Sequence, residues 1–267
     1  MSKIEEALEK AKQARSGVKE NKAVPETPME TTPKYTHTIF QGVNPDMMEE
    51  NRIVTLTGKS SHITEQYRML RTQILQRTEG NGDNCLMVTS AIDGEGKTTT
   101  AINLAVAIAQ EVQKNVLLVD ADLRRPSIHK VLGLKPEKGL VHYLIDHVPL
   151  ENLLIRTGVE KLTLLPAGGT RSNYTEIFNS SRMKNFIREV KERYKDRYVI
   201  FDTTPLLSTA DPVVLSQSMD GIIFVIQADR TQRSDLAEAL GLLEGRNILG
   251  IVMNSLLETG RIYDYET

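Results

Sequence analysis

The segment A-I-D-G-E-G-K-T-T-T, residues 91–100, restricts the fold of this chain more than any other feature. It follows C-L-M-V-T-S, a run typical of a buried strand, and it opens a helix-like run. Gly94 and Gly96 let the backbone turn its N–H groups inward, and a helix that begins near Lys97 adds its N-terminal dipole. Ala91 replaces the first glycine of the usual pattern, which removes no ligand. The segment predicts a phosphate-binding loop between a strand and a helix.

Side chains of this loop can hold a nucleotide and a metal ion. We expect Lys97 to reach the β- and γ-phosphates and the hydroxyl of Thr98 to bind Mg²⁺. Asn254 ends the last predicted strand, where its amide can read the adenine edge or simply form a turn. The predicted cofactors are ATP and Mg²⁺, and the predicted nucleotide-binding residues are Asp93, Gly94, Glu95, Gly96, Lys97, Thr98, Thr99 and Asn254.

Aliphatic and β-branched runs alternate with helical segments along the rest of the chain. The predicted strands are residues 85–90, 115–120, 162–166, 198–202, 222–227 and 248–254. The predicted helices are residues 62–79, 97–111, 139–146, 175–195, 211–218 and 231–244. Unbroken apolar strands are typically buried on both faces, and alternation with helices favours parallel pairing. The pattern predicts the α/β class, with a doubly wound and mainly parallel sheet.

Three aspartates follow two of these strands directly. Asp120 and Asp122 come after V-L-L-V, and Asp202 comes after Y-V-I-F. Ligands of open α/β sheets bind at the carboxyl ends of the strands. We therefore predict that these carboxylates serve the metal ion of the phosphate loop, the alternative being that each caps a helix or forms a turn.

Composition and charge narrow the class of protein. The formal net charge is -2 without a basic stripe, so nothing indicates a nucleic-acid partner. A single cysteine, Cys85, excludes an internal disulfide and fits a reducing cytosol. No apolar run approaches the length of a membrane span, and the charged N-terminus is not typical of a secretory signal. A cytoplasmic location is expected.

The pattern predicts three parts of the chain. Residues 1–50 are predicted to hold a short helix, residues 2–15, and a proline-containing flexible linker. Residues 51–256 are predicted to form the nucleotide-binding domain, and residues 257–267 a flexible tail with two tyrosines.

Four stretches together carry a family resemblance. They are S-A-I-D-G-E-G-K-T-T-T-A-I-N-L-A, V-L-L-V-D-A-D-L-R-R-P-S-I-H-K-V-L-G-L, L-L-P-A-G-G and V-I-F-D-T-T-P-L-L-S-T-A-D. In this order, over residues 55–255, they resemble the bacterial tyrosine kinases of exopolysaccharide and capsule synthesis, whose fold is the MinD/ParA-like type of P-loop NTPase. The N-terminal M-S-K-I-E-E-A-L-E-K-A resembles the exosortase-associated subgroup. Thr204 and Asp93 stand where the family usually has proline.

The resemblance implies an ATP-dependent autokinase that phosphorylates its own tail in trans. Tyr263 and Tyr265 would be the acceptors. Glu65, Arg68 and Arg71 have the E-x-x-R-x-x-R spacing of the family's oligomerisation motif. The implied partners are other copies in a ring, a membrane chain-length determinant (Wzz-like) adaptor that holds the kinase at the inner face of the plasma membrane, and a cognate tyrosine phosphatase.

Catalytic roles follow from this resemblance. Lys97 would bind phosphates, Thr98 would bind Mg²⁺ directly, and Asp122 and Asp202 would hold its waters. Asp120 would orient or deprotonate the incoming phenol. Arg124 and Arg125 would engage an acidic tail or a phosphate, or play a structural role.

Two other functions remain open at this point. One is a MinD/ParA-like switch ATPase, although residues 91–93 lack the additional lysine typical of that class. The other is a nucleotide-binding scaffold that regulates polysaccharide export without kinase activity.

Overall fold

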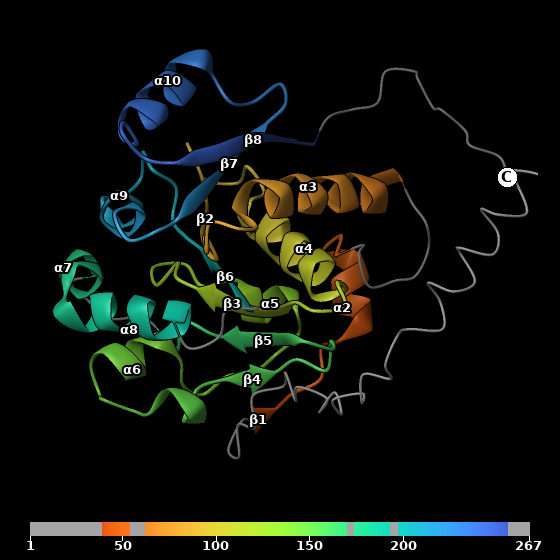
Figure 1. Cartoon of the computed structure of the whole chain (residues 1–267), viewed down its shortest axis with the longest axis vertical. Helices are drawn as coiled ribbons and strands as arrows, with labels where there is room; N and C mark the ends of the chain where they lie inside the picture. The colour runs from red at the N-terminus through yellow and green to blue at the C-terminus, as the bar shows by residue number, and fades with distance from the viewer. Residues whose placement is uncertain (1–38, 54–61, 170–173, 193–196, 256–267) are drawn as a thin grey trace, which may run out of the picture. The chain divides into compact units, whose positions relative to one another are not determined.

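The computed structural model describes residues 39–53, 62–169, 174–192 and 197–255, which all lie in the compact unit Lys34–Thr267. Their centre is one sheet, in which the strands are ordered β1-β4-β5-β3-β6-β2-β7-β8 (Figure 1). The strands are β1 (Ile39–Phe40), β2 (Cys85–Ser90), β3 (Asn115–Asp120), β4 (Ile155–Arg156), β5 (Leu162–Leu165), β6 (Arg197–Asp202), β7 (Gly221–Gln227) and β8 (Ile248–Asn254).

The direction of the strands confirms the predicted doubly wound sheet. All neighbouring strands pair in parallel except β4 and β5, which are antiparallel. The central strands β2, β3 and β6 are buried along their whole length, as their unbroken apolar runs predict. Their carboxyl ends therefore meet at one edge of the sheet.

Helices cover both faces of the sheet, and each face has its own apolar core. One core includes side chains from α2 (Pro45–Glu50), α3 (His62–Thr78), α4 (Lys97–Ala109) and α5 (Ile128–Val131). The other includes side chains from α6 (Leu140–Leu144), the short 3₁₀ helix η2 (Leu150–Asn152), α7 (Tyr174–Asn179), α8 (Ser181–Glu192), α9 (Asp211–Ser216) and α10 (Arg233–Gly241). Figure 1 shows α3 and α4 to the right of the sheet and α6 to α9 to its left.

Helix α4 occupies the most enclosed position. Every residue from Thr100 to Ala109 is buried, because the sheet covers one side of the helix and α3 packs on another. A helix that is apolar on all sides is stable only in such a place. The phosphate loop that leads into α4 is thereby anchored in the core.

The structure corrects the predicted N-terminal linker. Residues 39–50, which we placed in that linker, form β1 and α2, and Met48 and Ile53 are buried. The side chain of Asn44 accepts hydrogen bonds from the backbone N–H groups of Asp46 (2.9 Å) and Met47 (3.2 Å), so it caps α2. The predicted helix 2–15 lies outside the described residues.

A second correction concerns the predicted helix 175–195. It forms two helices, α7 and α8, which are interrupted at Ser180. The Ser180 hydroxyl accepts a hydrogen bond from the backbone N–H of Met183 (3.1 Å), which is how a serine caps a new helix. The sequence N-S-S at residues 179–181 could have indicated this break between two helices, because serine is a common helix cap.

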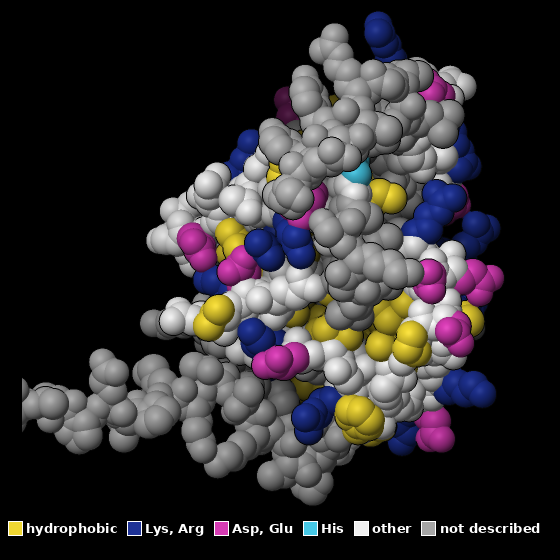
Figure 2. Space-filling view, turned by 90° about the vertical axis from the view of Figure 1, so that its right-hand side faces the viewer, with side chains coloured by type: hydrophobic (Ala, Val, Ile, Leu, Met, Phe, Trp, Pro, Cys, Tyr) yellow, Lys and Arg dark blue, Asp and Glu magenta, His cyan; other side chains and the backbone are white. Residues whose placement is uncertain are grey.

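The surface agrees with the balanced composition. On the face that Figure 2 shows, basic and acidic side chains are intermixed, so no area of one sign dominates the coloured residues. Among the described helices, none has the length and apolar character that spanning a bilayer requires.

Candidate active site

The phosphate loop joins β2 to α4 through two left-handed glycines. The φ angles of Gly94 and Gly96 are 83° and 89°, a conformation that other residues rarely adopt. Asn254, at the end of β8, donates a hydrogen bond from its amide nitrogen to the carbonyl oxygen of Glu95 (3.0 Å). The loop is therefore held from the far side by the edge strand. Whether Asn254 also reads adenine stays a prediction.

Replacing Gly96 with alanine is expected to damage this loop in two ways. A left-handed alanine costs about 1–2 kcal/mol, and its Cβ would lie 1.9 Å from the amide nitrogen of Asn254. Displacing that amide also breaks its bond to Glu95, so we expect the free energy of unfolding to fall by about 2–3 kcal/mol. We also expect at least tenfold weaker ATP binding, as measured by titration calorimetry.

Gly80 provides the matched control for this substitution. Its φ angle is 91°, and an added Cβ would meet nothing within 4 Å. Gly80→Ala should therefore lower the free energy of unfolding only by the cost of backbone strain, and it should leave ATP affinity unchanged. Equal effects of the two substitutions on ATP affinity would contradict the role given to Gly96.

Glu95 organises the loop from inside the protein. Its side chain is buried and accepts hydrogen bonds from the backbone N–H of Ile92 (2.8 Å) and from the hydroxyl of Thr231. Arg230 donates to the carbonyl oxygen of Gly94 (3.2 Å). Arg230 and Thr231 were not predicted, because they lie far along the chain in no recognisable motif. Because the Glu95 carboxylate is bound inside the protein, only the backbone of Glu95 remains to contact a nucleotide.

The structure brings the predicted carboxylates to the start of α4. Asp120 and Asp202 are register partners on the adjacent strands β3 and β6. The Thr98 hydroxyl donates to Asp202 (2.7 Å), and the Lys97 ammonium lies 3.4 Å from a carboxylate oxygen of Asp122. A lysine, a hydroxyl and three carboxylates therefore converge where the phosphate loop begins its helix.

Burial sets the protonation of these groups. It raises the pKa of Asp202 to about 6, although Lys97 and Thr98 oppose the shift. Burial also raises the pKa of Asp120 well above its usual range, and the charges of Asp202 and Asp122 add to this. For Lys97, burial favours the neutral form, but the attraction of Asp202 and Asp122 outweighs it and raises the pKa. The lysine is therefore charged at neutral pH.

The site contains carboxylate oxygens, which are ligands of the type that Mg²⁺ prefers. One carboxylate oxygen each of Asp120 and Asp202 is buried without a hydrogen-bond partner. Within the described ranges, no group of three or more histidine, cysteine or acidic side chains could hold a metal ion. Mg²⁺ commonly binds through only one or two protein ligands together with waters and substrate phosphates. Thr98 and Asp202 fit such a site.

Two predicted arginines lie next to the carboxylates and have partners. Arg124 is paired with Asp211 (2.7 Å) and lies over the ring of Tyr174, 5.2 Å from its centroid. Arg125 is paired with Asp93 (3.2 Å), and both side chains are exposed. The backbone N–H of Arg125 donates to Asp122 (2.9 Å). Asp211, which begins α9, was not predicted as a site residue.

The remaining predicted residues lie away from this cluster. Glu65 and Arg68 form an ion pair with each other on the exposed side of α3. Arg71 instead contacts the chain's own Glu111 (2.9 Å), at the end of α4. The acceptor tyrosines predicted in the tail are outside the described residues.

The chain is similar to one described family and to several known proteins. Residues 85–242 match the family model described as an AAA domain. The tyrosine-protein kinase YwqD of Bacillus subtilis is 36% identical over 208 residues, which cover 77% of this chain and 86% of that protein. The succinoglycan biosynthesis transport protein ExoP of Rhizobium meliloti is 29% identical over 224 residues, 81% of this chain but 28% of ExoP.

Solved structures agree with these relatives. The kinase domain of the Escherichia coli tyrosine kinase ETK superposes with a TM-score of 0.72 at 28% identity, over 80% of this chain and 84% of that domain. MinD of Pyrococcus furiosus, at 24% identity and a TM-score of 0.54 over 64% of this chain and 71% of that protein, shares the fold alone. The chain is a nucleotide-binding P-loop protein and belongs to the family of bacterial tyrosine-protein kinases.

Proposed function

We propose that this protein is an ATP-dependent tyrosine autokinase that phosphorylates Tyr263 and Tyr265 in the tail of a neighbouring copy. The observation that carries the proposal is the convergence of Lys97, Thr98 and the three aspartates at the phosphate loop. Membership of the tyrosine kinase family supplies the acceptor chemistry.

The reaction transfers the γ-phosphoryl group of ATP to a phenol oxygen. A bond forms between that oxygen and the γ-phosphorus, the bond to the β–γ bridging oxygen breaks, and ADP leaves. Lys97 and the N–H groups of the loop position and neutralise the phosphates. Thr98 would bind Mg²⁺, with Asp202 and Asp122 holding its waters, and the bound ion would supply further charge neutralisation.

Asp120 is the candidate acceptor for the phenol proton. It is fully buried and its raised pKa makes it a stronger base than an ordinary carboxylate. One of its oxygens accepts a hydrogen bond from the backbone N–H of Ile128 (3.2 Å), and the other has no partner. That free oxygen is available to orient the phenol and to take its proton.

Assembly of copies is part of the proposal. Glu65 and Arg68 pair only within an exposed stretch of α3, and such pairs contribute little to stability. They can therefore exchange partners with a neighbouring copy in a ring at low cost. Arg71 is more enclosed and contacts Glu111, so joining a neighbouring copy would require it to leave this partner.

The cellular role follows from the family resemblance and from ExoP, a relative named for succinoglycan biosynthesis. We place the kinase in the regulation of exopolysaccharide polymerisation and export. Its partners would be a membrane chain-length determinant (Wzz-like) adaptor, which holds it at the inner face of the plasma membrane, and a cognate tyrosine phosphatase.

The direct test is peptide mass spectrometry after incubation with MgATP, with and without the adaptor's cytoplasmic segment. Phosphate on Tyr263 or Tyr265 is the expected result. ATP turnover without tyrosine phosphate under either condition would instead favour the switch ATPase, and no turnover would favour the scaffold.

Phosphorylation should also loosen the assembly. Each phosphate adds about -1.5 to -2 charges to a tail that already carries Asp264 and Glu266. The double substitution Tyr263→Phe and Tyr265→Phe is therefore expected to keep the oligomer assembled in MgATP, as measured by analytical ultracentrifugation. Tyr143→Phe removes one phenol from the folded domain and is the control. Dissociation of the double variant at the rate of the unsubstituted protein would argue against the cycle.

A further inference from the structure

A pocket of about 590 Å³ opens next to the carboxylate cluster, and of the roles above only the contact suggested for Arg124 and Arg125 with an acidic tail or a phosphate concerns it. Two loops form most of it. One follows β3 and continues into α5, and the other follows β5. Besides two prolines, the pocket is lined by Arg124, Arg125, His129, Lys130, Gly168 and Gly169.

The lining is cationic and contains no acidic residue. The charge of Arg124 is balanced by Asp211, and that of Arg125 is shared with Asp93 at the surface. Lys130 has no ion-pair partner among the residues that the structure describes. The occupant of this pocket should therefore be an anion.

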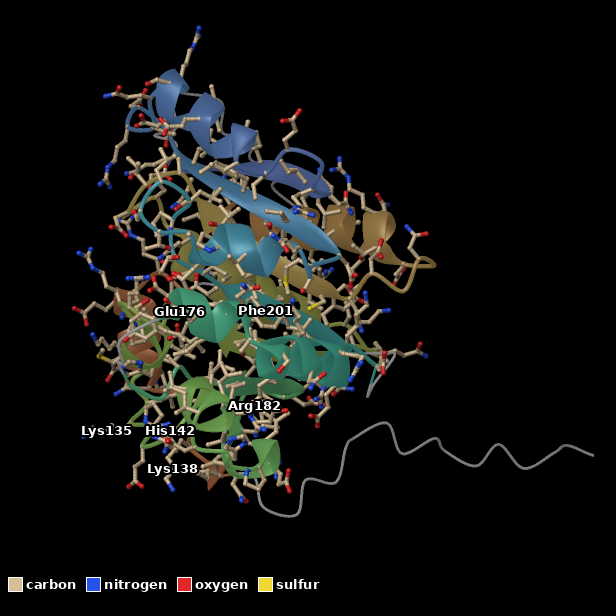
Figure 3. The ribbon with its side chains drawn as sticks, turned by 90° about the vertical axis from the view of Figure 1, so that its left-hand side faces the viewer. Lys135, Lys138, His142, Glu176, Arg182 and Phe201 are labelled. Carbon is tan, nitrogen blue, oxygen red and sulfur yellow. The ribbon has the colours of Figure 1, made fainter. Side chains whose placement is uncertain are left out.

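More positive charge flanks the opening. Lys135 precedes the lining residue Pro136, and Lys138 precedes Gly139, whose backbone packs against Gly168. Figure 3 shows Lys135 and Lys138 together at one corner of the molecule, away from Arg182 on α8. Glu137 lies between these two lysines in the sequence and is also exposed, so the segment adds one net positive charge beside the pocket.

The same short segment connects this pocket to the reacting groups. The hydroxyl of Ser127 donates to that of Thr98 (3.3 Å), and the backbone N–H of Ile128 donates to Asp120 (3.2 Å). The neighbouring residues His129 and Lys130 line the pocket. A ligand in the pocket therefore contacts the residues that directly follow Ile128, whose backbone N–H binds the proposed proton acceptor Asp120.

The chain's own C-terminal sequence has the matching chemistry. In I-Y-D-Y-E, the phenols of Tyr263 and Tyr265 alternate with the carboxylates of Asp264 and Glu266. In an extended peptide, alternate side chains point to opposite sides. A peptide in that conformation presents its phenols to one wall of a cleft and its carboxylates to the other.

We propose that the pocket is a specificity subsite for the acceptor peptide. It binds the carboxylate of Asp264 or Glu266 from the tail of a second copy while a neighbouring phenol faces Asp120. Lys130 supplies the main unpaired charge, and Arg125 exchanges its exposed partner Asp93 for the incoming carboxylate. This inference rests on the proposed kinase function, and it makes the substrate class a tyrosine flanked by acidic residues.

Binding can be measured without any catalysis. The probe is a fluorescent peptide of residues 257–267 in which both tyrosines are replaced by phenylalanine, added to the full-length protein with MgADP. Neutralising the peptide by Asp264→Asn and Glu266→Gln is expected to weaken binding about tenfold at low salt, and less at high salt. Lys130→Glu in the protein should weaken binding of the acidic peptide to a similar degree.

Lys184→Glu is the matched control, since it makes the same charge change at an exposed position of α8 outside the pocket. It should leave peptide binding unchanged. Lys130→Ala, which introduces no new charge, serves if Lys130→Glu does not fold. Equal affinity for the acidic and the neutral peptide would overturn the subsite.

Charge reversal distinguishes direct contact from a structural effect. A peptide with Asp264→Lys and Glu266→Lys should bind Lys130→Glu at least fivefold more tightly than it binds the unsubstituted protein. A damaged pocket would bind both peptides poorly, and that result would contradict the proposal.

Transfer between full-length chains then separates the subsite from the kinase function. The donor carries Tyr263→Phe and Tyr265→Phe, and the acceptor carries Lys97→Met. Acid-dependent peptide binding without any phosphate transfer would refute the kinase and leave the subsite standing. Transfer at the same rate to acceptors with and without Asp264→Asn and Glu266→Gln would refute the subsite and leave the kinase standing.

Discussion

Lys97→Met is expected to lower the rate of tyrosine phosphorylation by at least about 10³-fold. The ammonium of Lys97 is the charged donor of the phosphate loop, and it lies 3.4 Å from Asp122 inside a largely buried site. Methionine has a similar length but neither charge nor hydrogen-bond donors. The γ-phosphate would lose its main cationic contact where few waters replace it.

The measurement is incorporation of radioactive phosphate from ATP, with circular dichroism to show that the fold persists. Lys184→Met makes the same chemical change on the surface of α8 and should retain full activity. A Lys97→Met protein that kept a tenth of the activity or more would mean that another cation holds the phosphates.

Asp202→Asn is expected to stabilise the ligand-free protein while it lowers phosphorylation by at least about 10²-fold. Burial raises the pKa of Asp202 to about 6, and one of its oxygens has no hydrogen-bond partner. Its charge at pH 8 therefore costs stability, by about 3 kcal/mol if the unfolded value is near the usual 3.8. Asparagine can still accept the hydrogen bond of Thr98, but it lacks the charge that a metal ion needs.

The pH dependence follows from the direction of this shift. A carboxyl whose folded pKa lies above its unfolded pKa destabilises the fold at high pH, and this cost begins to fall as the pH drops below about 6 and is gone only near the unfolded value of 3.8. The stability advantage of Asp202→Asn should therefore be largest at pH 8 and shrink at pH 5. Urea unfolding in EDTA at both pH values measures it.

A paired carboxylate provides the contrast. Asp220 contacts Lys191 and accepts hydrogen bonds from two backbone N–H groups, those of Asn84 (3.1 Å) and Cys85 (3.0 Å). Asp220→Asn should lower the free energy of unfolding, because it removes a charge that Lys191 and the two N–H groups stabilise in the folded protein. If Asp202→Asn also lowered stability at pH 8, the buried charge of Asp202 would have to be compensated in the folded protein.

The central strands and the phosphate loop could be predicted because each depends on local sequence. An unbroken apolar run ending in aspartate is typical of a buried parallel strand, and β3 and β6 have this form. Strands β1 and β4 could not be predicted this way, because two residues carry no periodicity. Helix α2 did have a signal, since N-P-D places a capping asparagine before a first-turn proline.

The unpredicted part of the site comes from tertiary contacts. Thr231 and Arg230 hold the phosphate loop from 136 residues away, and Asp211 reaches Arg124 across 87 residues. Each is an ordinary polar residue at a loop or helix start, so only the folded sheet shows its partner. The three aspartates could be predicted to lie together, because parallel strands bring their carboxyl ends to one edge of the sheet.

The contact between Asn254 and the phosphate loop also fixes the length of a tether. Tyr263 lies nine residues beyond Asn254, and Tyr265 lies eleven beyond it. A fully extended chain spans about 3.3–3.6 Å per residue, so the two tyrosines can reach no farther than about 32 Å and about 40 Å from their own loop. Any neighbouring copy that receives this tail must therefore place its catalytic carboxylates within that radius, which limits the spacing and tilt of subunits in a ring.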